Sequence, residues 1–289
     1  MIEVTKDILK KVYQPRPAAL AVRKYDYGLL LVIGGSEFYS GSPALSSLAA
    51  FKAGVDMVRV IAPKRAADIV ASFSPILAAY PLAGDWVGKD HLAILLSMAE
   101  AAKDVARGKA AVVIGGGIGR TEETKDAIIA FLTQNNLPAV IDADAIYALA
   151  KNPSAIKGEN SLVTPNTFEF YILTGKEVYQ LPDEEKIKIV QEEAAKLKAT
   201  ILLKGKIDII SDGHEVALNK TGSPYLSKGG TGDTLAGIAG ALLARGVDCF
   251  TAAQAAAYIN GLAGQIAVKK NGESIVATDL IEAITEAIR

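Results

Sequence analysis

Residues 228–237 read KGGTGDTLAG, so three glycines precede Asp233 where a small-residue helix is predicted to start. Glycine is a poor helix former, and a turn alone would not need this many. The unpaired N–H groups at a helix N-terminus carry roughly half a positive charge and bind phosphate. Glycines would let a phosphate reach this backbone, although a flexible loop in which Asp233 only caps the helix would use the same residues. The motif by itself leaves both interpretations open.

Two familiar phosphate-binding motifs do not match residues 228–237. A Walker loop would place Lys and then Ser or Thr after the glycines, and a dinucleotide fingerprint would place spaced glycines directly after a strand. Neither pattern is present at this point of the sequence. The glycines therefore predict a different kind of phosphate-binding site.

The chain around this motif alternates between short apolar runs and longer segments with helical spacing. This alternation is typical of an α/β fold with a mostly parallel sheet that helices cover on both faces. The predicted strands are 27–35, 55–63, 110–117, 138–146, 161–165 and 200–210. The predicted helices are 43–54, 91–108, 121–136, 183–199, 234–246, 251–270 and 277–288. A strand at 214–219 would pair back through SDGH as a hairpin, which predicts an antiparallel edge.

No repeat, low-complexity tract or charged linker divides the sequence, so residues 1–289 are predicted to form a single domain. Open α/β sheets bind their ligands at the carboxyl ends of the strands. Glycines and acidic residues at these ends are therefore the first candidates for a site.

The composition excludes several classes of partner. Of the 289 residues, 50% are apolar and 22% are charged, and the net charge of −1 argues against a nucleic-acid binder or a basic membrane-surface protein. Cys249 is the only cysteine, which excludes an intrachain disulfide and a multi-cysteine metal site. Residues 1–17 have the spacing of a short amphipathic helix and lack the apolar core of a signal peptide, and no later stretch is suited to cross a membrane. We expect a cytoplasmic protein with a small-molecule partner.

The segment NKTGSPYLSKGGTGDTLAGIAGALLARG (219–246) closely resembles the signature of the ribokinase-like small-molecule kinases. Within that superfamily it is most similar to the ADP/ATP-dependent NAD(P)H-hydrate dehydratases, whose pattern runs Asn-x-Thr-Gly and then Gly-Gly-Ser/Thr-Gly-Asp-x-Leu-x-Gly. Further segments resemble family blocks in the family order, namely 34–63, 113–120, 140–149, 163–175 and 202–210. The resemblance spans nearly the whole chain.

The resemblance implies a ribokinase-like three-layer α/β/α fold and a metabolite-repair reaction. In such enzymes a hydroxyl on a hydrated nicotinamide ring takes a phosphoryl group from ADP or ATP, and phosphate then leaves to restore NADH or NADPH. Mg²⁺ is implied as the cofactor, and a homo-oligomer, a tetramer, is expected. The epimerase domain that often accompanies such enzymes has no counterpart here, so we expect a stand-alone dehydratase domain.

Catalysis is assigned by the resemblance to Asp233 and to the backbone before it. The amides of Gly230, Thr231, Gly232 and Asp233 would stabilise the charge on the transferred phosphoryl group. The Asp233 carboxylate would accept the proton of the substrate hydroxyl. Because a helix N-terminus favours the charged carboxylate, we expect a lowered pKa for Asp233.

Nucleotide contacts are implied along two segments that resemble the family's phosphate- and ribose-binding residues. They are Lys204, Gly205, Lys206, Ile207 and Asp208, followed by Asn219, Thr221 and Gly232. A lysine at a strand end is more often simply solvated. Asn219 and Thr221 would equally suit a local turn.

Substrate contacts are implied at Tyr39, Ser42, Gly119, Asp142, Asn166 and Asp233. Gly117, like Gly119, would let substrate phosphates approach the loop after its strand. Ser42 stands where the family often has alanine.

The sequence departs from the dehydratase pattern at NTFE (166–169), where the family more often has His-Pro-Gly-Glu. Glu169 keeps the acidic position and would contact Mg²⁺ through water. Because Asn-x-x-Glu also occurs in pyridoxal and hydroxymethylpyrimidine kinases, a vitamin or sugar kinase that releases a phosphorylated product is the main alternative. A non-catalytic nucleotide sensor is a third hypothesis, and the retention of a base such as Asp233 argues against it.

Three further polar residues are expected to have no part in a functional site. Asp144 is expected to cap the helix that starts near residue 145. His91, at a predicted helix start, and His214, in the predicted hairpin, are expected at the surface.

Overall fold

The computed structural model describes residues 1–14, 22–156 and 158–289. Within these ranges, ten strands form one sheet in the order β1-β10-β9-β8-β7-β6-β5-β2-β3-β4. The strands are β1 (Ile2–Glu3), β2 (Leu29–Ile33), β3 (Met57–Pro63), β4 (Ala78–Leu82), β5 (Ala110–Ile114), β6 (Ala139–Ile141), β7 (Ser161–Val163), β8 (Thr200–Leu203), β9 (Asp208–Ser211) and β10 (Val216–Asn219).

The neighbouring strands β8, β7, β6, β5, β2, β3 and β4 run parallel to one another, and β9 is antiparallel to both of its neighbours. The central strands carry continuous apolar runs, and every residue of β2 and β5 is buried. Such runs are expected where a parallel sheet is covered on both faces. The predicted mostly parallel sheet with an antiparallel hairpin edge is confirmed.

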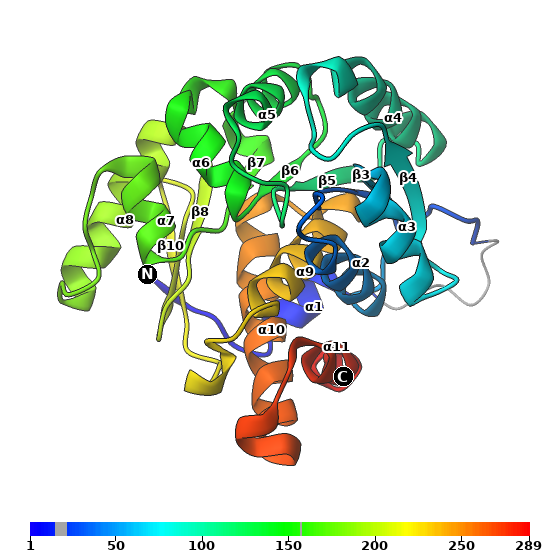
Figure 1. The fold of residues 1–289 in the computed structure, drawn as a ribbon. Helices are drawn as coiled ribbons and strands as arrows, with labels where there is room; N and C mark the ends of the chain where they lie inside the picture. The colour runs from blue at the N-terminus through cyan, green and yellow to red at the C-terminus, as the bar shows by residue number, and fades with distance from the viewer. Residues whose placement is uncertain (15–21, 157) are drawn as a thin grey trace.

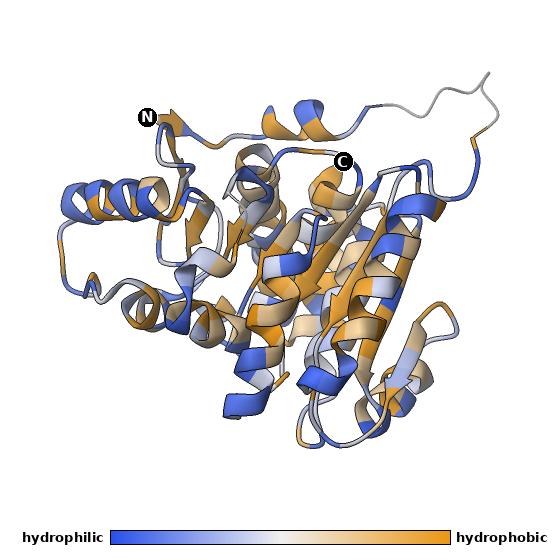
Figure 2. Ribbon diagram, turned by 90° about the horizontal axis from the view of Figure 1, so that it is seen from above, coloured by the Kyte–Doolittle hydropathy of each residue, from blue (hydrophilic) through white to orange (hydrophobic). Residues whose placement is uncertain are grey.

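Helices pack on both faces and complete the three layers (Figure 1). One face carries α1 (Ile8–Val12), α2 (Gly41–Lys52), α3 (Lys64–Phe73), α9 (Thr231–Ala244), α10 (Cys249–Asn271) and α11 (Ala277–Ile288). The other carries α4 (Leu92–Val105), α5 (Glu122–Gln134), α6 (Asp144–Lys151), α7 (Thr167–Thr174) and α8 (Asp183–Leu197). Figure 2 shows the central strands between them in the hydrophobic colour.

Helix α9 places the glycine run at the carboxyl edge of the sheet. It packs closely on α2, because a Cβ at Gly237 would lie only 2.1 Å from the Ser46 carbonyl oxygen. The Ser46 hydroxyl in turn donates to the Asp233 carbonyl oxygen at 3.0 Å. The first turn of α9 is therefore fixed against α2.

The alanine-rich helix α10 lies in the core against α9 and α11. Its buried Asn260 accepts a hydrogen bond from the Thr234 hydroxyl at 2.7 Å, which ties it to the start of α9. None of the helices in the described part of the chain is both long and apolar enough to cross a membrane.

Several element predictions were wrong in detail. The run 200–210 forms two antiparallel strands, β8 and β9, because the chain turns back at residues 204–207. Strand β4 and helix α3 were not predicted at all. At the start of the chain, the expected helix over 1–17 is limited to α1, and strand β1 precedes it, while residues 15–17 lie outside the described ranges. The hairpin between β9 and β10 is confirmed.

Candidate active site

A buried cluster of opposite charges lies at the carboxyl ends of β6 and β8. Lys204, directly after β8, donates from Nζ to Oδ1 of Asp142 at 3.0 Å and lies 3.7 Å from Oε2 of Glu169. The Thr164 hydroxyl donates to the same Asp142 oxygen at 2.7 Å. Asp142 is only 3% exposed, so it needs these partners. The structure thus brings together three residues that the sequence singled out separately.

The Lys204 ammonium is held in its charged form. Burial by itself lowers the pKa of this group, but the carboxylates of Asp142, Glu169 and Asp233 outweigh that effect, and the net pKa is raised. A fixed positive charge at the end of a strand is suited to binding phosphate.

Asp233 occupies the first turn of α9 beside this cluster. Its pKa is raised to about 7, chiefly by burial and also by the charge of the neighbouring Asp142, while a hydrogen bond from Ser42 and the charge of Lys204 act in the opposite direction. The lowered pKa that the helix N-terminus predicted is wrong, because desolvation and a second carboxylate outweigh the helix dipole. A carboxyl group with this pKa is suited to accept a proton near neutral pH.

The glycine run adopts two different backbone conformations at the start of α9. Gly230, with φ of 93°, is the left-handed N-cap residue. The Thr231 N–H lies 3.5 Å from the Lys228 carbonyl oxygen, whereas no backbone hydrogen bond engages the N–H groups of Gly232 and Asp233 within the described chain. A Cβ at Gly232 would lie 3.5 Å from Lys204 Nζ. Free amides and an ammonium group therefore face the same space.

A cavity of about 940 Å³ opens in front of Gly232 and Lys204. Its lining includes most of the residues for which nucleotide binding was predicted, namely Lys204, Gly205, Lys206, Asp208, Thr221 and Gly232, and also the substrate candidate Asn166. Ile207 and Asn219 are not among the lining residues. The cavity also exposes Lys220 and Lys228, which the sequence reasoning missed although Lys228 directly precedes the glycines.

Asn219 does not line the cavity but forms hydrogen bonds with two residues that do. Its Nδ2 donates to Asp208 Oδ2 at 2.9 Å, and its Oδ1 accepts from the Thr221 hydroxyl at 2.9 Å. The Gly205 N–H donates to the other Asp208 oxygen at 3.1 Å. Burial raises the pKa of Asp208 to about 6 even though these hydrogen bonds and Lys204 lower it. Asn219 therefore holds two of the predicted nucleotide residues in place.

Asn166 and Glu169 form a capping box at the start of α7. The Glu169 N–H donates to Asn166 Oδ1 at 2.9 Å, and the Asn166 N–H donates to Glu169 Oε2 at 2.8 Å. The described residues contain no group of three His, Cys, Asp or Glu side chains that could hold a metal ion. The single Glu169 carboxylate would suit only an ion such as Mg²⁺ that keeps most of its water and is held mainly by substrate phosphates.

The family follows from a sequence comparison. A family model described as NAD(P)H-hydrate dehydratase matches residues 30–286. The chain belongs to the NAD(P)H-hydrate dehydratase family. This agrees with the resemblance seen in residues 219–246.

Similar dehydratase-family proteins include a bifunctional NAD(P)H-hydrate repair enzyme of Hyperthermus butylicus, 39% identical over 96% of this chain and 51% of its own length. The chain thus spans about half the length of the curated relatives of this kind. An ADP-dependent (S)-NAD(P)H-hydrate dehydratase of Nitrosopumilus maritimus is 34% identical over 99% of this chain and 96% of its own.

Solved structures show the same fold. An ADP/ATP-dependent NAD(P)H-hydrate dehydratase of Bacillus subtilis, co-crystallised with ATP and Mg²⁺, superimposes with a TM-score of 0.79. It is 23% identical and covers 99% of this chain and 97% of its own. A ribokinase-like superfamily protein of Enterococcus faecalis is 25% identical, with a TM-score of 0.82 over 99% of this chain and 95% of its own, so the predicted ribokinase-like fold is confirmed.

Three of the predicted substrate residues, Tyr39, Ser42 and Asp233, lie against a glycine-rich backbone after β5. Ser42 and Asp233 lie against Gly116, since a Cβ there would be 3.0 Å from Ser42 Cβ and 2.9 Å from Asp233 Oδ1. Tyr39 lies against Gly117, because a Cβ on that glycine would be 2.7 Å from the Cβ of Tyr39. Gly119, for which a substrate contact stays a prediction, lies under the ring of Trp86. No sequence motif indicated Trp86 as a candidate for the site.

The predictions that Asp144 caps a helix and that His91 lies at the surface were wrong. Asp144 is the first residue of α6 and does not cap it; the N-cap is Ala143, and the Asp144 carboxylate accepts from the Gly119 N–H at 3.0 Å and pairs with Arg120. His91 is 8% exposed, and its Nδ1 accepts from the Gly88 N–H at 3.0 Å. His214 is exposed as expected.

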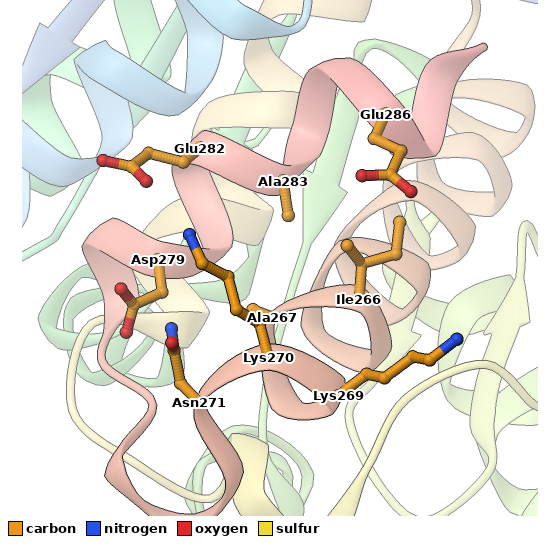
Figure 3. Close-up of a pocket in the computed structure, with 9 residues that line it drawn as sticks. All are labelled: Ile266, Ala267, Lys269, Lys270, Asn271, Asp279, Glu282, Ala283 and Glu286. Carbon is orange, nitrogen blue, oxygen red and sulfur yellow. The ribbon is translucent and has the colours of Figure 1, made fainter.

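A second, smaller cavity of about 390 Å³ lies between α10 and α11 (Figure 3). Lys269 and Lys270 line it from the last turn of α10, and Asp279, Glu282 and Glu286 line it from α11. It shares no lining residue with the cavity in front of Lys204. We therefore assign it no part in the site.

Proposed function

We propose that this chain catalyses the nucleotide-dependent dehydration of (S)-NAD(P)H hydrate to NAD(P)H, with ADP or ATP as the phosphoryl donor. The observation that carries the proposal is the carboxyl group of Asp233, with a pKa of about 7, in the same helix turn as the free amides that face Lys204. The family and the names of similar proteins supply the substrate.

The reaction would begin with the nucleotide in the cavity in front of Lys204. Its terminal phosphoryl group would face the N–H groups of Gly232 and Asp233, which stabilise the charge that develops during transfer. The substrate hydroxyl would give its proton to the Asp233 carboxylate as its oxygen bonds to phosphorus, while the bond from phosphorus to the bridging oxygen of ADP or ATP breaks and AMP or ADP leaves. Inorganic phosphate would then leave the ring with the electrons of the C–O bond, and loss of a proton from the neighbouring ring carbon would restore the double bond.

The chain's own residues would divide these tasks between them. Lys204 would neutralise charge on the donor phosphates, and Asp208 would accept a hydrogen bond from a ribose hydroxyl. Ser42 would orient the Asp233 carboxylate, and Asn166 would present its free amide group to ligand. Mg²⁺, when bound to the nucleotide, would supply further charge neutralisation near Glu169.

A vitamin kinase remains the second candidate, favoured by Asn166 in place of the dehydratase histidine. It would use the same base and amides, but it would release a phosphorylated product. The two reactions are separated by supplying hydrated NADH, hydrated NADPH, pyridoxal or hydroxymethylpyrimidine with ADP or ATP. Reduced dinucleotide with free phosphate supports the dehydratase, and a stable phosphate ester on pyridoxal or the pyrimidine would replace it with the kinase.

The proposal also includes a cytoplasmic homotetramer without nucleic-acid partners. Its support is the composition and the family resemblance. Light scattering coupled to size-exclusion chromatography tests the tetramer, and cell fractionation tests the location.

A further inference from the structure

Four side chains from three separate segments of the chain lie in order along the backbone of residues 116–119. Asp233 and Ser42 lie against Gly116, Tyr39 lies against Gly117, and Trp86 lies against Gly119. At Gly119 a Cβ would be 2.3 Å from Cζ3 of the indole, so the ring rests directly on the backbone. The backbone of residues 116–119, called the glycine segment below, therefore contacts Asp233 at one end, Tyr39 next to it and Trp86 at the other end.

Trp86 is held in place and yet remains accessible. The loop that carries it is tied to the Tyr39 loop by a hydrogen bond from the Glu37 N–H to the Asp85 carbonyl oxygen at 2.8 Å. The following residue, Val87, is 1% exposed and anchors the loop in the core, whereas Trp86 is 37% exposed. A tryptophan needed only for packing would be expected to follow Val87 inward. An indole fixed at the surface is suited to bind a flat ring.

The distance along the glycine segment from Gly116 to Gly119 indicates which part of a dinucleotide would reach Trp86. Gly119 lies three positions after Gly116, so the Cα atoms of the two glycines are at most about 11 Å apart. In the proposed function the hydrated nicotinamide ring has its hydroxyl at Asp233, next to Gly116. Because that ring has lost its aromatic character, the stacking partner at the other end is the adenine, whose faces remain aromatic.

We propose that Trp86 is a substrate-binding residue that stacks on the adenine of the hydrated dinucleotide and thereby selects a dinucleotide over a mononucleotide. This inference rests on the proposed function. It assigns a role to the loop between β4 and α4, which the proposed reaction does not otherwise use.

The test compares hydrated NADH with the hydrate of reduced nicotinamide mononucleotide, which lacks the adenylate half. In Trp86→Ala, KM for hydrated NADH should rise roughly tenfold at unchanged kcat, as expected for the loss of one base–aromatic stack. KM for the hydrated mononucleotide and for ADP should not change, and Trp86→Phe should restore most of the loss. Phe73→Ala, an exposed aromatic at the end of α3, is the matched control.

Trp86 is the chain's only tryptophan, so its emission reports on the residue directly. Hydrated NADPH without ADP should protect it from acrylamide quenching, and ADP alone should not. An unchanged KM for hydrated NADH in Trp86→Ala, an equal rise for both substrates, or unprotected emission would overturn the inference. Wild-type protein that turns over neither substrate would instead remove the proposed function.

Discussion

Lys204 and Asp142 form a buried ion pair in which the lysine Nζ lies 3.0 Å from the carboxylate Oδ1. The two residues act on Asp233 in opposite directions, since the charge of Asp142 raises the pKa of Asp233 and that of Lys204 lowers it. Burial is the main cause of the raised pKa of Asp233, and the pair adjusts that pKa without requiring that either partner touch the substrate hydroxyl.

The first prediction concerns the pH dependence of the reaction. Asp233 must be deprotonated to accept a proton, so kcat/KM for the hydrated dinucleotide should fall about tenfold per pH unit below its pKa of about 7. Initial rates at saturating nucleotide across a pH series measure this.

The ion pair allows a matched test of that assignment. Asp142→Asn removes a negative charge near Asp233 and should move the midpoint of the pH profile downward. Lys204→Met removes a positive charge and should move it upward, besides weakening nucleotide binding by about 1.5–3 kcal/mol. Midpoints that shift together, or do not move, would show that another group controls the profile.

The second prediction concerns the removal of the base. Asp233→Asn keeps the amides of the helix turn in place and should retain nucleotide binding, while turnover should fall about a thousandfold or more. Calorimetry with ADP and a rate assay on the same sample check both parts. Asp68→Asn, which changes an exposed acid on α3, is the control. Near-wild-type turnover by Asp233→Asn would remove this residue from the mechanism.

The third prediction links the same pKa to stability. The folded protein holds the Asp233 proton up to about pH 7, whereas the unfolded chain releases it near the ordinary value of 3.8. The contribution of this group to the free energy of unfolding should therefore decrease as pH rises through that window, by at most about 4 kcal/mol, and level off above it. Urea unfolding of wild type and Asp233→Asn across this window should show the variant gaining stability relative to wild type as pH rises. A constant difference would contradict the raised pKa.

The fourth prediction separates the anion-binding amides from the turn that presents them. Gly232 has no positive φ, and a Cβ there would meet only Lys204 Nζ at 3.5 Å, so Gly232→Ala should fold normally. Its methyl group would obstruct the space in front of the amides, and the rate should fall by the equivalent of about 3 kcal/mol.

Gly230→Ala should behave in the opposite way. Gly230 has φ of 93°, and a Cβ there would lie 2.7 Å from Leu45 Cδ1 and 2.8 Å from Ala277 Cβ. The melting temperature should drop, because the left-handed backbone and both contacts are unfavourable to alanine. If Gly232→Ala lost stability and kept its rate, the glycine would serve only the turn.

The central sheet could be predicted from the sequence because strands buried on both faces read as unbroken apolar runs, as in β2 and β5. Strand β4 was missed because it lies at the sheet edge, is largely exposed and contains Pro81. Helix α3 was missed because it follows β3 at Pro63 without an intervening turn motif.

The site could be predicted only where a motif marked it. The glycine run and Lys204 belong to recognisable motifs, and the structure places them around one cavity. The pKa of Asp233 depends on burial and on Asp142, which is distant in sequence, so local helix chemistry gave the wrong direction. Trp86 reaches the substrate residues only through the folding of the loop after β4.

The dehydration at Asp233 is tested most directly by following reduced-nicotinamide absorbance and inorganic phosphate together, with purified protein, hydrated NADH and ADP or ATP. With wild-type protein, absorbance should return and phosphate should appear in a one-to-one ratio, and with Asp233→Asn neither should change. Nucleotide consumption that leaves a stable phosphorylated product and no return of absorbance would contradict it.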